Sequence, residues 1–99
     1  MHDALEQYLA DREAHDPGFA ALVEAAEQRR AFARSMAARR RKIGLSQTQV
    51  AARMETSPSI VSRIERGDDV RISTLEKYLV ALGFGLHLRT RRLTNSAAG

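Results

Sequence analysis

The apolar positions of residues 46–67 recur at helical spacing in two short runs, which a polar turn separates. The first run begins at Ser46, and Gln49 stands three residues later, as a capping box at a helix start requires. The inward positions of this run have the spacing of one buried helix face: Val50, Ala51 and Met54. The pattern predicts a short helix that ends in a turn at Glu55 and Thr56.

The second run is expected to start at Ser57 and Pro58. Serine is a good helix cap, and proline at the first helical position loses no hydrogen bond. Two apolar residues of this run face inward, Val61 and Ile64. Four residues share the opposite, polar face: Ser59, Ser62, Arg63 and Arg66. Gly67 is placed to stop the helix, so the whole stretch predicts two helices joined by a tight turn.

Upstream of this pair, the pattern predicts further helix. Residues 1–15 are expected to form a short acidic helix with a narrow apolar stripe: Leu5, Tyr8 and Leu9. Such a helix is marginal alone and must dock on a surface. A second start signal, Asp16-Pro17, precedes apolar positions that recur from Phe19 to Ala37, with no helix breaker before Gly44. The pattern leaves open whether this region is one long helix or two.

Downstream, Ser73 and Glu76 have the spacing of another capping box, and Gly83 ends the helix that they open. Residues 84–91 then alternate apolar and polar positions, which is the period of a strand. A single strand has unpaired edges, and pairing with the same strand of a second copy satisfies one of them. We therefore expect a homodimer with contacts from Phe84, Leu86, Leu88 and Thr90. Residues 94–99 are small and polar, and we expect a disordered tail.

The composition favours one mostly helical domain. A chain of 99 residues suffices for one small core, and its few aromatic residues and many Ala, Leu, Glu and Arg favour helices. Cysteine is absent, and no segment is typical of a membrane span or a signal peptide. We expect a soluble, cytoplasmic protein. The histidines lack metal-ligand spacing and no catalytic arrangement is recognisable, so no metal, cofactor or enzyme activity is expected.

Charge is distributed unevenly along the chain. Residues 1–28 contain seven Asp or Glu and one Arg, for a net charge of −6. Residues 29–42 contain seven Lys or Arg and no acidic residue, for a net charge of +7. This basic block lies directly before the predicted helix pair, where the backbone of a bound DNA would pass. It is also compatible with an ordinary solvated helix end, because cations are favoured there.

Residues 39–82 resemble the helix-turn-helix region of lambdoid phage repressors and the wider Xre/Cro-type regulators. Gln47 matches the glutamine that opens the first motif helix, and Ala51 matches the small residue where the two helices cross. Further matches are Val61, Ile64 and the ending Glu65-Arg66-Gly67. The resemblance implies an all-α fold with a five-helix core. Glu55 departs from the family, which has a left-handed glycine there, so we expect a slightly strained turn.

The resemblance places the second motif helix in the major groove of DNA. It implies base contacts from Ser57, Pro58, Ser59, Ser62 and Arg63, and phosphate contacts from Arg39, Lys42, Gln47 and Arg66. Arg63 is the main candidate for base reading, because its planar guanidinium can bond O6 and N7 of one guanine. A symmetric dimer implies a palindromic operator. The alternative for the serines and arginines is an ordinary wet helix face.

A narrower resemblance, to HigA-type antitoxins, covers nearly the whole chain. It rests on the acidic leader with Asp16-Pro17-x-Phe19, the helix-turn-helix and the Ala-Leu-Gly-Phe-x-Leu of residues 81–86. It implies a protein that neutralises a small basic RelE/HigB-like ribonuclease toxin and represses the operon that both share. Candidate toxin contacts are Leu5, Tyr8, Leu9 and Phe19. A stand-alone regulator, whose leader packs on its own core, is the alternative.

These expectations divide the chain into four parts. They are an acidic helical extension at residues 1–28, a helix-turn-helix domain at 29–83, a dimerisation strand at 84–93 and a tail at 94–99.

Overall fold

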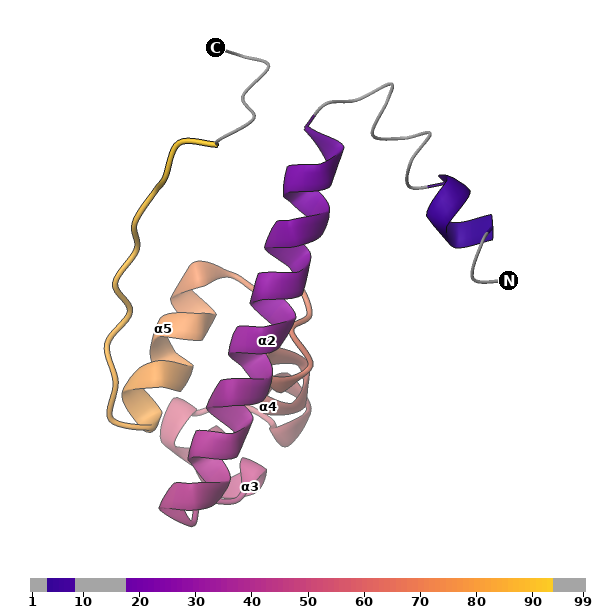
Figure 1. The fold of residues 1–99 in the computed structure, drawn as a ribbon. Coiled ribbons are helices and arrows are strands. Elements are labelled where there is room, and N and C mark those ends of the chain that lie inside the picture. The colour runs from indigo at the N-terminus through magenta and orange to yellow at the C-terminus, as the bar shows by residue number, and fades with distance from the viewer. Residues whose placement is uncertain (1–3, 9–17, 94–99) are drawn as a thin grey trace. The chain divides into compact units, whose positions relative to one another are not determined.

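The computed structural model describes residues 4–8 and 18–93 of the chain, and their regular secondary structure is all helical. A short helical segment occupies residues 4–8. The labelled helices are α2 (Phe19–Ile43), α3 (Gln47–Met54), α4 (Pro58–Glu65) and α5 (Ile72–Ala81) (Figure 1). The apolar run that begins at Phe19 is therefore one long helix. Its expected start signal at Asp16-Pro17 lies outside the described residues.

Packing divides the chain into two compact units. One unit is residues 28–89, and it contains α3, α4, α5 and the larger part of α2. The expected core of five helices is therefore a core of four in the described residues, counting α2 with α3, α4 and α5. The fifth helical segment lies at residues 4–8. The other unit is residues 1–27 with 90–99. Within it, Arg91 Nη2 lies 3.6 Å from Glu24 Oε1, between two exposed side chains.

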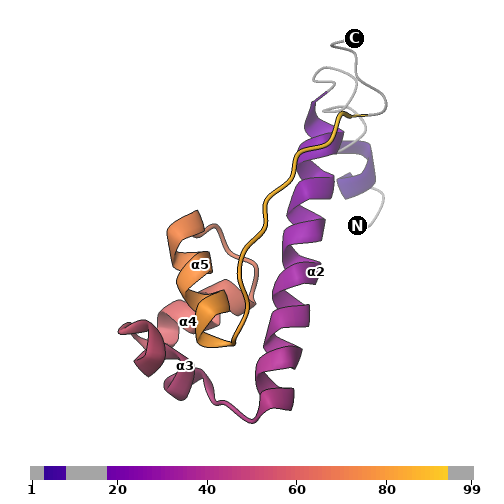
Figure 2. The ribbon, with the colours of Figure 1, turned by 90° about the vertical axis from the view of Figure 1, so that its left-hand side faces the viewer.

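The core of the larger unit lies where α3, α4 and α5 gather beside the carboxyl-terminal part of α2 (Figure 2). Its buried residues include every inward position expected for the two motif helices: Val50, Ala51, Met54, Val61 and Ile64. α5 adds Tyr78, Leu79 and Ala81, followed by Leu82. Val50, Val61 and Tyr78 are completely covered. Helix α2 contributes small residues, Ala33 and Ala37, which allow its backbone to approach the other helices closely.

The start signals predicted from the sequence are confirmed for α3 and α4 but not for α5. At α3 the capping box is present: the Ser46 hydroxyl accepts the Gln49 N–H at 3.0 Å, and Gln49 Oε1 accepts the Ser46 N–H at 2.8 Å. Ser57 is the N-cap residue of α4 and Pro58 is its first residue, as expected. The capping box predicted at Ser73 is wrong. Helix α5 already begins at Ile72 after an extended Arg71, so Ser73 lies inside the first turn.

The turn between α3 and α4 has the strained conformation that the sequence predicts. Glu55 has φ 56° and ψ 46°, in the left-handed region, and it is the only non-glycine residue with positive φ in the described chain. The conformation lets the N–H of Thr56 bond the carbonyl of Ala51 at 2.9 Å, which closes α3. Glycines with positive φ follow the ends of α2, α4 and α5: Gly44, Gly67 and Gly83.

Gly67, at the end of α4, has a second reason to be glycine. Its φ is +79°, and a Cβ atom placed there would lie 2.9 Å from the Cα atom of Arg30 on α2. The Gly67 carbonyl also accepts a hydrogen bond from Arg29 Nε at 3.2 Å. The end of α4 therefore lies directly against the α2 backbone, and this contact fixes the distance between the two helices.

Residues 84–93 have no regular secondary structure in this single chain, so the expected strand is not seen. A strand requires a hydrogen-bonded neighbour, and the expected neighbour is a second copy. Leu86 is partly buried against the core, whereas Leu88 is 65% exposed and Phe84 is 37% exposed. Pairing of this segment stays a prediction. The expected tail at 94–99 lies outside the described residues.

Candidate nucleic-acid interface

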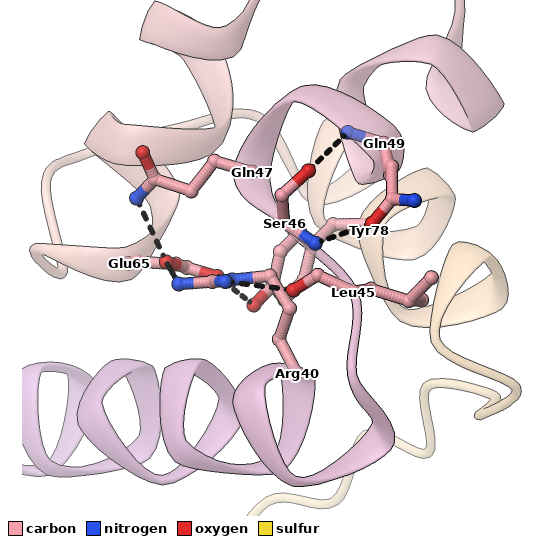
Figure 3. A network of polar contacts seen from close by, with 7 residues as sticks. All are labelled: Arg40, Leu45, Ser46, Gln47, Gln49, Glu65 and Tyr78. Atoms are coloured by element: carbon pink, nitrogen blue, oxygen red, sulfur yellow. Dashed lines mark hydrogen bonds and ion pairs between the residues drawn. The ribbon is translucent and has the colours of Figure 1, made fainter.

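A buried polar network joins the four helices of the larger unit around the carboxylate of Glu65, at the end of α4 (Figure 3). Arg40 of α2 donates from Nε to Glu65 Oε2 at 2.7 Å and from Nη2 to Glu65 Oε1 at 3.1 Å. Its remaining arm, Nη1, donates to the carbonyl of Leu45 at 2.8 Å. The two charged side chains are 9% and 6% exposed, so this ion pair is largely removed from water.

Two neutral groups complete the network. Gln47 of α3 donates from Nε2 to Glu65 Oε1 at 3.0 Å, and the Tyr78 hydroxyl of α5 donates to Glu65 Oε2 at 2.6 Å. Each carboxylate oxygen therefore accepts two hydrogen bonds, and no buried side-chain polar atom in the described residues lacks a partner. Because each helix contributes one group, the network fixes α3 and α4 relative to α2 and α5.

The network sets the protonation states of its members. Burial would raise the pKa of the Glu65 carboxyl, but hydrogen bonds from Arg40, Gln47 and Tyr78 outweigh burial and leave that pKa below its ordinary value. Burial, with the bond to Glu65, raises the pKa of the Tyr78 phenol. The bond to Glu65 raises the pKa of Arg40 despite burial. At neutral pH the network is thus an ion pair with a neutral phenol.

The polar face of α4 is open to solvent. Ser57, Pro58, Ser59 and Arg63 are exposed, and the Ser57 and Ser59 hydroxyls hydrogen-bond each other at 2.9 Å. The Ser57 hydroxyl therefore does not cap a backbone amide of the helix. The side chain of Arg63 makes no hydrogen bond or ion pair with another described residue. Its guanidinium is available for a ligand.

Ser62 and Arg66 lie one turn apart at the other edge of this face. Arg66 donates from Nη1 to the Ser62 hydroxyl at 3.2 Å and from Nη2 to Asp68 Oδ2 at 2.9 Å. Ser62 is half-buried and Arg66 is exposed. The residues at α4 that are expected at the DNA therefore lie together on one side of the helix, and four of them are already hydrogen-bonded in two pairs.

The basic block does not form one surface, because successive helical residues are turned by about 100° from one another. Arg40 is buried in the network. Arg39 is exposed, and its Cζ atom lies 5.3 Å from the ring centroid of Phe84, a cation–π distance. Lys42 is exposed. The expected phosphate ligand Arg39 and the expected dimer residue Phe84 are therefore in contact within one chain.

A basic cleft, defined by its lining residues, opens between α2, α3 and α4. The lining residues are Arg34, Ala37, Arg40, Arg41, Gln47, Ser62, Glu65 and Arg66. It brings together three residues expected to contact DNA: Gln47, Ser62 and Arg66. It adds Arg34 and Arg41 of α2, which belong to the basic block but were not among the individual residues expected at phosphates. Their signal was present, because residues 34, 37 and 41 have the spacing of one helix face around a small alanine.

Sequence reasoning also missed the role of Glu65. Its signal was its position four residues after Val61, on the inward side of α4, where a charged residue requires a partner. The identity of that partner was hidden, because Arg40 is one of four consecutive basic residues with equivalent chemistry. Only the packing of α2 against α4 shows which one is buried.

The four expected toxin contacts fall in the acidic extension. Leu5 and Tyr8 lie in the helical segment 4–8, where they are 59% and 55% exposed. Phe19 is the partly buried first residue of α2, and Leu9 lies outside the described residues. In residues 4–8 and 18–93, no helix is long and apolar enough to cross a membrane. The same ranges contain no cluster of three His, Cys, Asp or Glu residues suited to a metal ion.

Comparison with known proteins agrees with this geometry. The family described as Helix-turn-helix matches residues 36–88, a range that includes α3, α4, α5 and the end of α2. Two curated proteins named Antitoxin HigA1, from Mycobacterium tuberculosis strains CDC 1551 / Oshkosh and ATCC 25618 / H37Rv, are each 38% identical over 89 residues. These residues are 89% of this chain and 60% of each relative, so the chain spans less than two thirds of their length.

Proposed function

Because this chain belongs to the helix-turn-helix family, we propose that it is a sequence-specific DNA-binding repressor and the antitoxin of the operon it represses. The observation that carries the DNA-binding part is the exposed polar face of α4, with the unpaired Arg63. The buried network around Glu65 fixes this helix, so the face is already in place before DNA binds. A preformed surface loses little conformational entropy on binding.

In the proposed complex, α4 enters the major groove and its amino-terminal residues lie nearest the bases. The residues that contact bases are Ser57, Pro58, Ser59, Ser62 and Arg63. The backbone is held through Arg39, Lys42, Gln47 and Arg66. A homodimer, paired through residues 84–91, presents two such helices to a palindromic operator. The proposal assigns no catalytic activity to the chain.

The DNA-binding part is tested with two duplexes of equal length. One is the sequence upstream of the protein's own gene, and the other is the same sequence scrambled. We expect tighter binding to the native sequence, because α4 reads base edges as well as phosphates. Equal affinity for the two duplexes over a series of salt concentrations would contradict sequence-specific recognition at this site.

The antitoxin part rests on the resemblance to proteins named Antitoxin HigA1, which extends through 89% of this chain. The partner that we propose is a small basic RelE/HigB-like ribonuclease. The net charge of −6 in residues 1–28 suits such a partner, since opposite charges speed and orient association. Exposed Leu5 and Tyr8 supply apolar contacts beside that charge.

The antitoxin part is tested by co-expression with the product of the neighbouring gene. The full chain should co-purify with that product, and a chain lacking residues 1–15 should lose most of the toxin binding. DNA binding should survive this deletion, because residues 36–88 carry the family match. Operator binding by the full chain without any toxin binding would instead indicate a stand-alone regulator.

A further inference from the structure

We propose that the basic cleft between α2, α3 and α4 binds one phosphate of the DNA backbone, with Arg34 and Arg41 as its principal ligands. The inference rests on the proposed DNA-binding function. It goes beyond that function because it assigns the phosphate to a defined site. It also adds two residues of α2 that lie within the basic block of residues 29–42 but are not among the individual residues expected at phosphates.

The two arginines are placed to act together. Arg34 and Arg41 are seven residues apart on α2, which is close to two helical turns, so both project to the same side. Ala37 lies between them and also lines the cleft. Because its side chain is a single methyl group, the space between the two guanidinium groups is not filled by α2 itself.

Both arginines are also free of competing partners. Each is exposed, and neither guanidinium group makes a hydrogen bond or an ion pair with another described residue. Arg66, on the opposite edge of the cleft, already donates to Ser62 and Asp68. A phosphate can therefore use Arg34 and Arg41 without breaking an existing contact, whereas Arg66 must exchange one.

The acidic residue in the cleft does not oppose an anion. Both oxygens of Glu65 are fully occupied by donors from Arg40, Gln47 and Tyr78. Arg40 cancels the charge of Glu65, and Asp68 pairs with Arg66, so the positive charge of Arg34 and Arg41 is left over. The Gln47 amide donates one of its two hydrogens to Glu65, and the second is available to a ligand.

The position of the cleft favours a backbone phosphate over a free anion. Ser62, which lies on the polar face of α4, also lines the cleft. A phosphate bound there would belong to the strand that borders the groove into which α4 inserts. Phosphate contacts of this kind set the register of a recognition helix without reading sequence.

The test compares Arg34→Gln and Arg41→Gln with the matched control Lys77→Gln, which removes one exposed charge from α5 outside the cleft. Affinity for the native upstream duplex and for its scrambled version is measured over a salt series. Each arginine variant should weaken both duplexes by the same factor. In each variant the slope of log K against log salt concentration should fall by about one for every phosphate interaction that a subunit can no longer make. Lys77→Gln should leave the slope unchanged.

A double-mutant cycle distinguishes two explanations for weaker DNA binding: loss of contacts to one shared phosphate, and a general loss of positive charge. If Arg41 and Gln47 bind the same phosphate, the effects of Arg41→Gln and Gln47→Ala on DNA affinity should not add. Urea unfolding of each variant shows whether the domain is intact. Arg41→Lys, which keeps the charge, should retain the wild-type salt slope.

Three results would overturn the inference. One is a salt slope for both arginine variants equal to that of the Lys77→Gln control. Another is a loss confined to the native duplex, which would make the arginines base-reading residues. The third is loss of DNA binding when millimolar inorganic phosphate is added at constant ionic strength, if that loss depends on the same two arginines. Such a result would indicate a site for a free anion. If the wild-type protein binds neither duplex, the proposed function fails along with the inference.

Discussion

Arg63 is the residue whose substitution separates base reading from phosphate binding. It is exposed and unpaired on α4, and its guanidinium can bond two acceptors of one guanine. Arg63→Ala should cost about 1–3 kcal/mol of binding free energy on the operator and remove the preference at one base pair per half-site. The measurement is a titration of the operator and of single-site variants. An equal loss on scrambled DNA would make Arg63 a phosphate ligand instead.

Glu65 should be the most sensitive polar residue for stability. Glu65→Gln leaves the Arg40 charge buried without its counter-ion, and breaking such a pair costs about 3–5 kcal/mol. Urea unfolding at neutral pH measures this loss, and Glu76→Gln on the exposed face of α5 is the control. A loss no larger than that of the control would show that the ion pair contributes nothing net.

The same pair predicts a pH dependence with a definite sign. The pKa of Glu65 is lowered in the folded protein, so the unfolded chain binds this proton more readily. The contribution of the pair is therefore present above the unfolded pKa, about 4.3 for a glutamate. It is lost as pH falls through the lower folded value. The stability difference between wild type and Glu65→Gln should shrink over that range.

Substitutions at the two positive-φ positions Glu55 and Gly67 should change the stability of the domain, and glycine should be the more stable residue at both. Glu55→Gly should stabilise the domain by at most about 1 kcal/mol, because glycine takes the left-handed conformation at little cost. Gly67→Ala should destabilise it, since the added Cβ would collide with the Arg30 backbone. Urea midpoints with unchanged slopes measure both effects. A stabilising Gly67→Ala would contradict the close approach of α4 to α2.

At the scale of elements, local chemistry predicted the motif helices and tertiary packing decided the rest. The capping box at Ser46 and the proline start at Pro58 act within a few residues, so the sequence alone located α3 and α4. At Ser73 the local signal failed, because Leu75 and Tyr78 pack inward from a helix that begins at Ile72, two residues before the start that the capping box predicted. A capping pattern is therefore reliable only where the buried face agrees with it.

The candidate site was predictable in part for the same reason. The exposed serines and Arg63 follow from the period of α4, which a sequence displays directly. The separate environments of Arg39, Arg40 and Arg41 do not, because they depend on what packs against each side of α2. One lies on an aromatic ring, the next is buried and the third lines a cleft. Adjacent residues of one charge thus have three different roles.

At the scale of the whole molecule, the testable expectation is the homodimer. A chain that ends before Phe84 should be monomeric and bind the operator more weakly, because two linked half-site contacts become separate events. The Phe84 N–H also bonds the Leu79 carbonyl at the end of α5, so a second variant is needed. Leu88→Glu changes only an exposed side chain. Sedimentation showing an unchanged dimer for both variants would contradict pairing through residues 84–91.

The two sides of α4 have a consequence for how such a protein diversifies. The inward side carries Val61, Ile64 and Glu65, each committed to partners on other helices, so change there requires matching change elsewhere. The outward side carries Ser59 and Arg63, whose side chains are exposed and bond no group on another helix of the described residues. Substitutions at these outward positions can accumulate singly without unfolding the domain. A new operator preference can therefore arise in small steps, each of which leaves a folded protein for selection to act on.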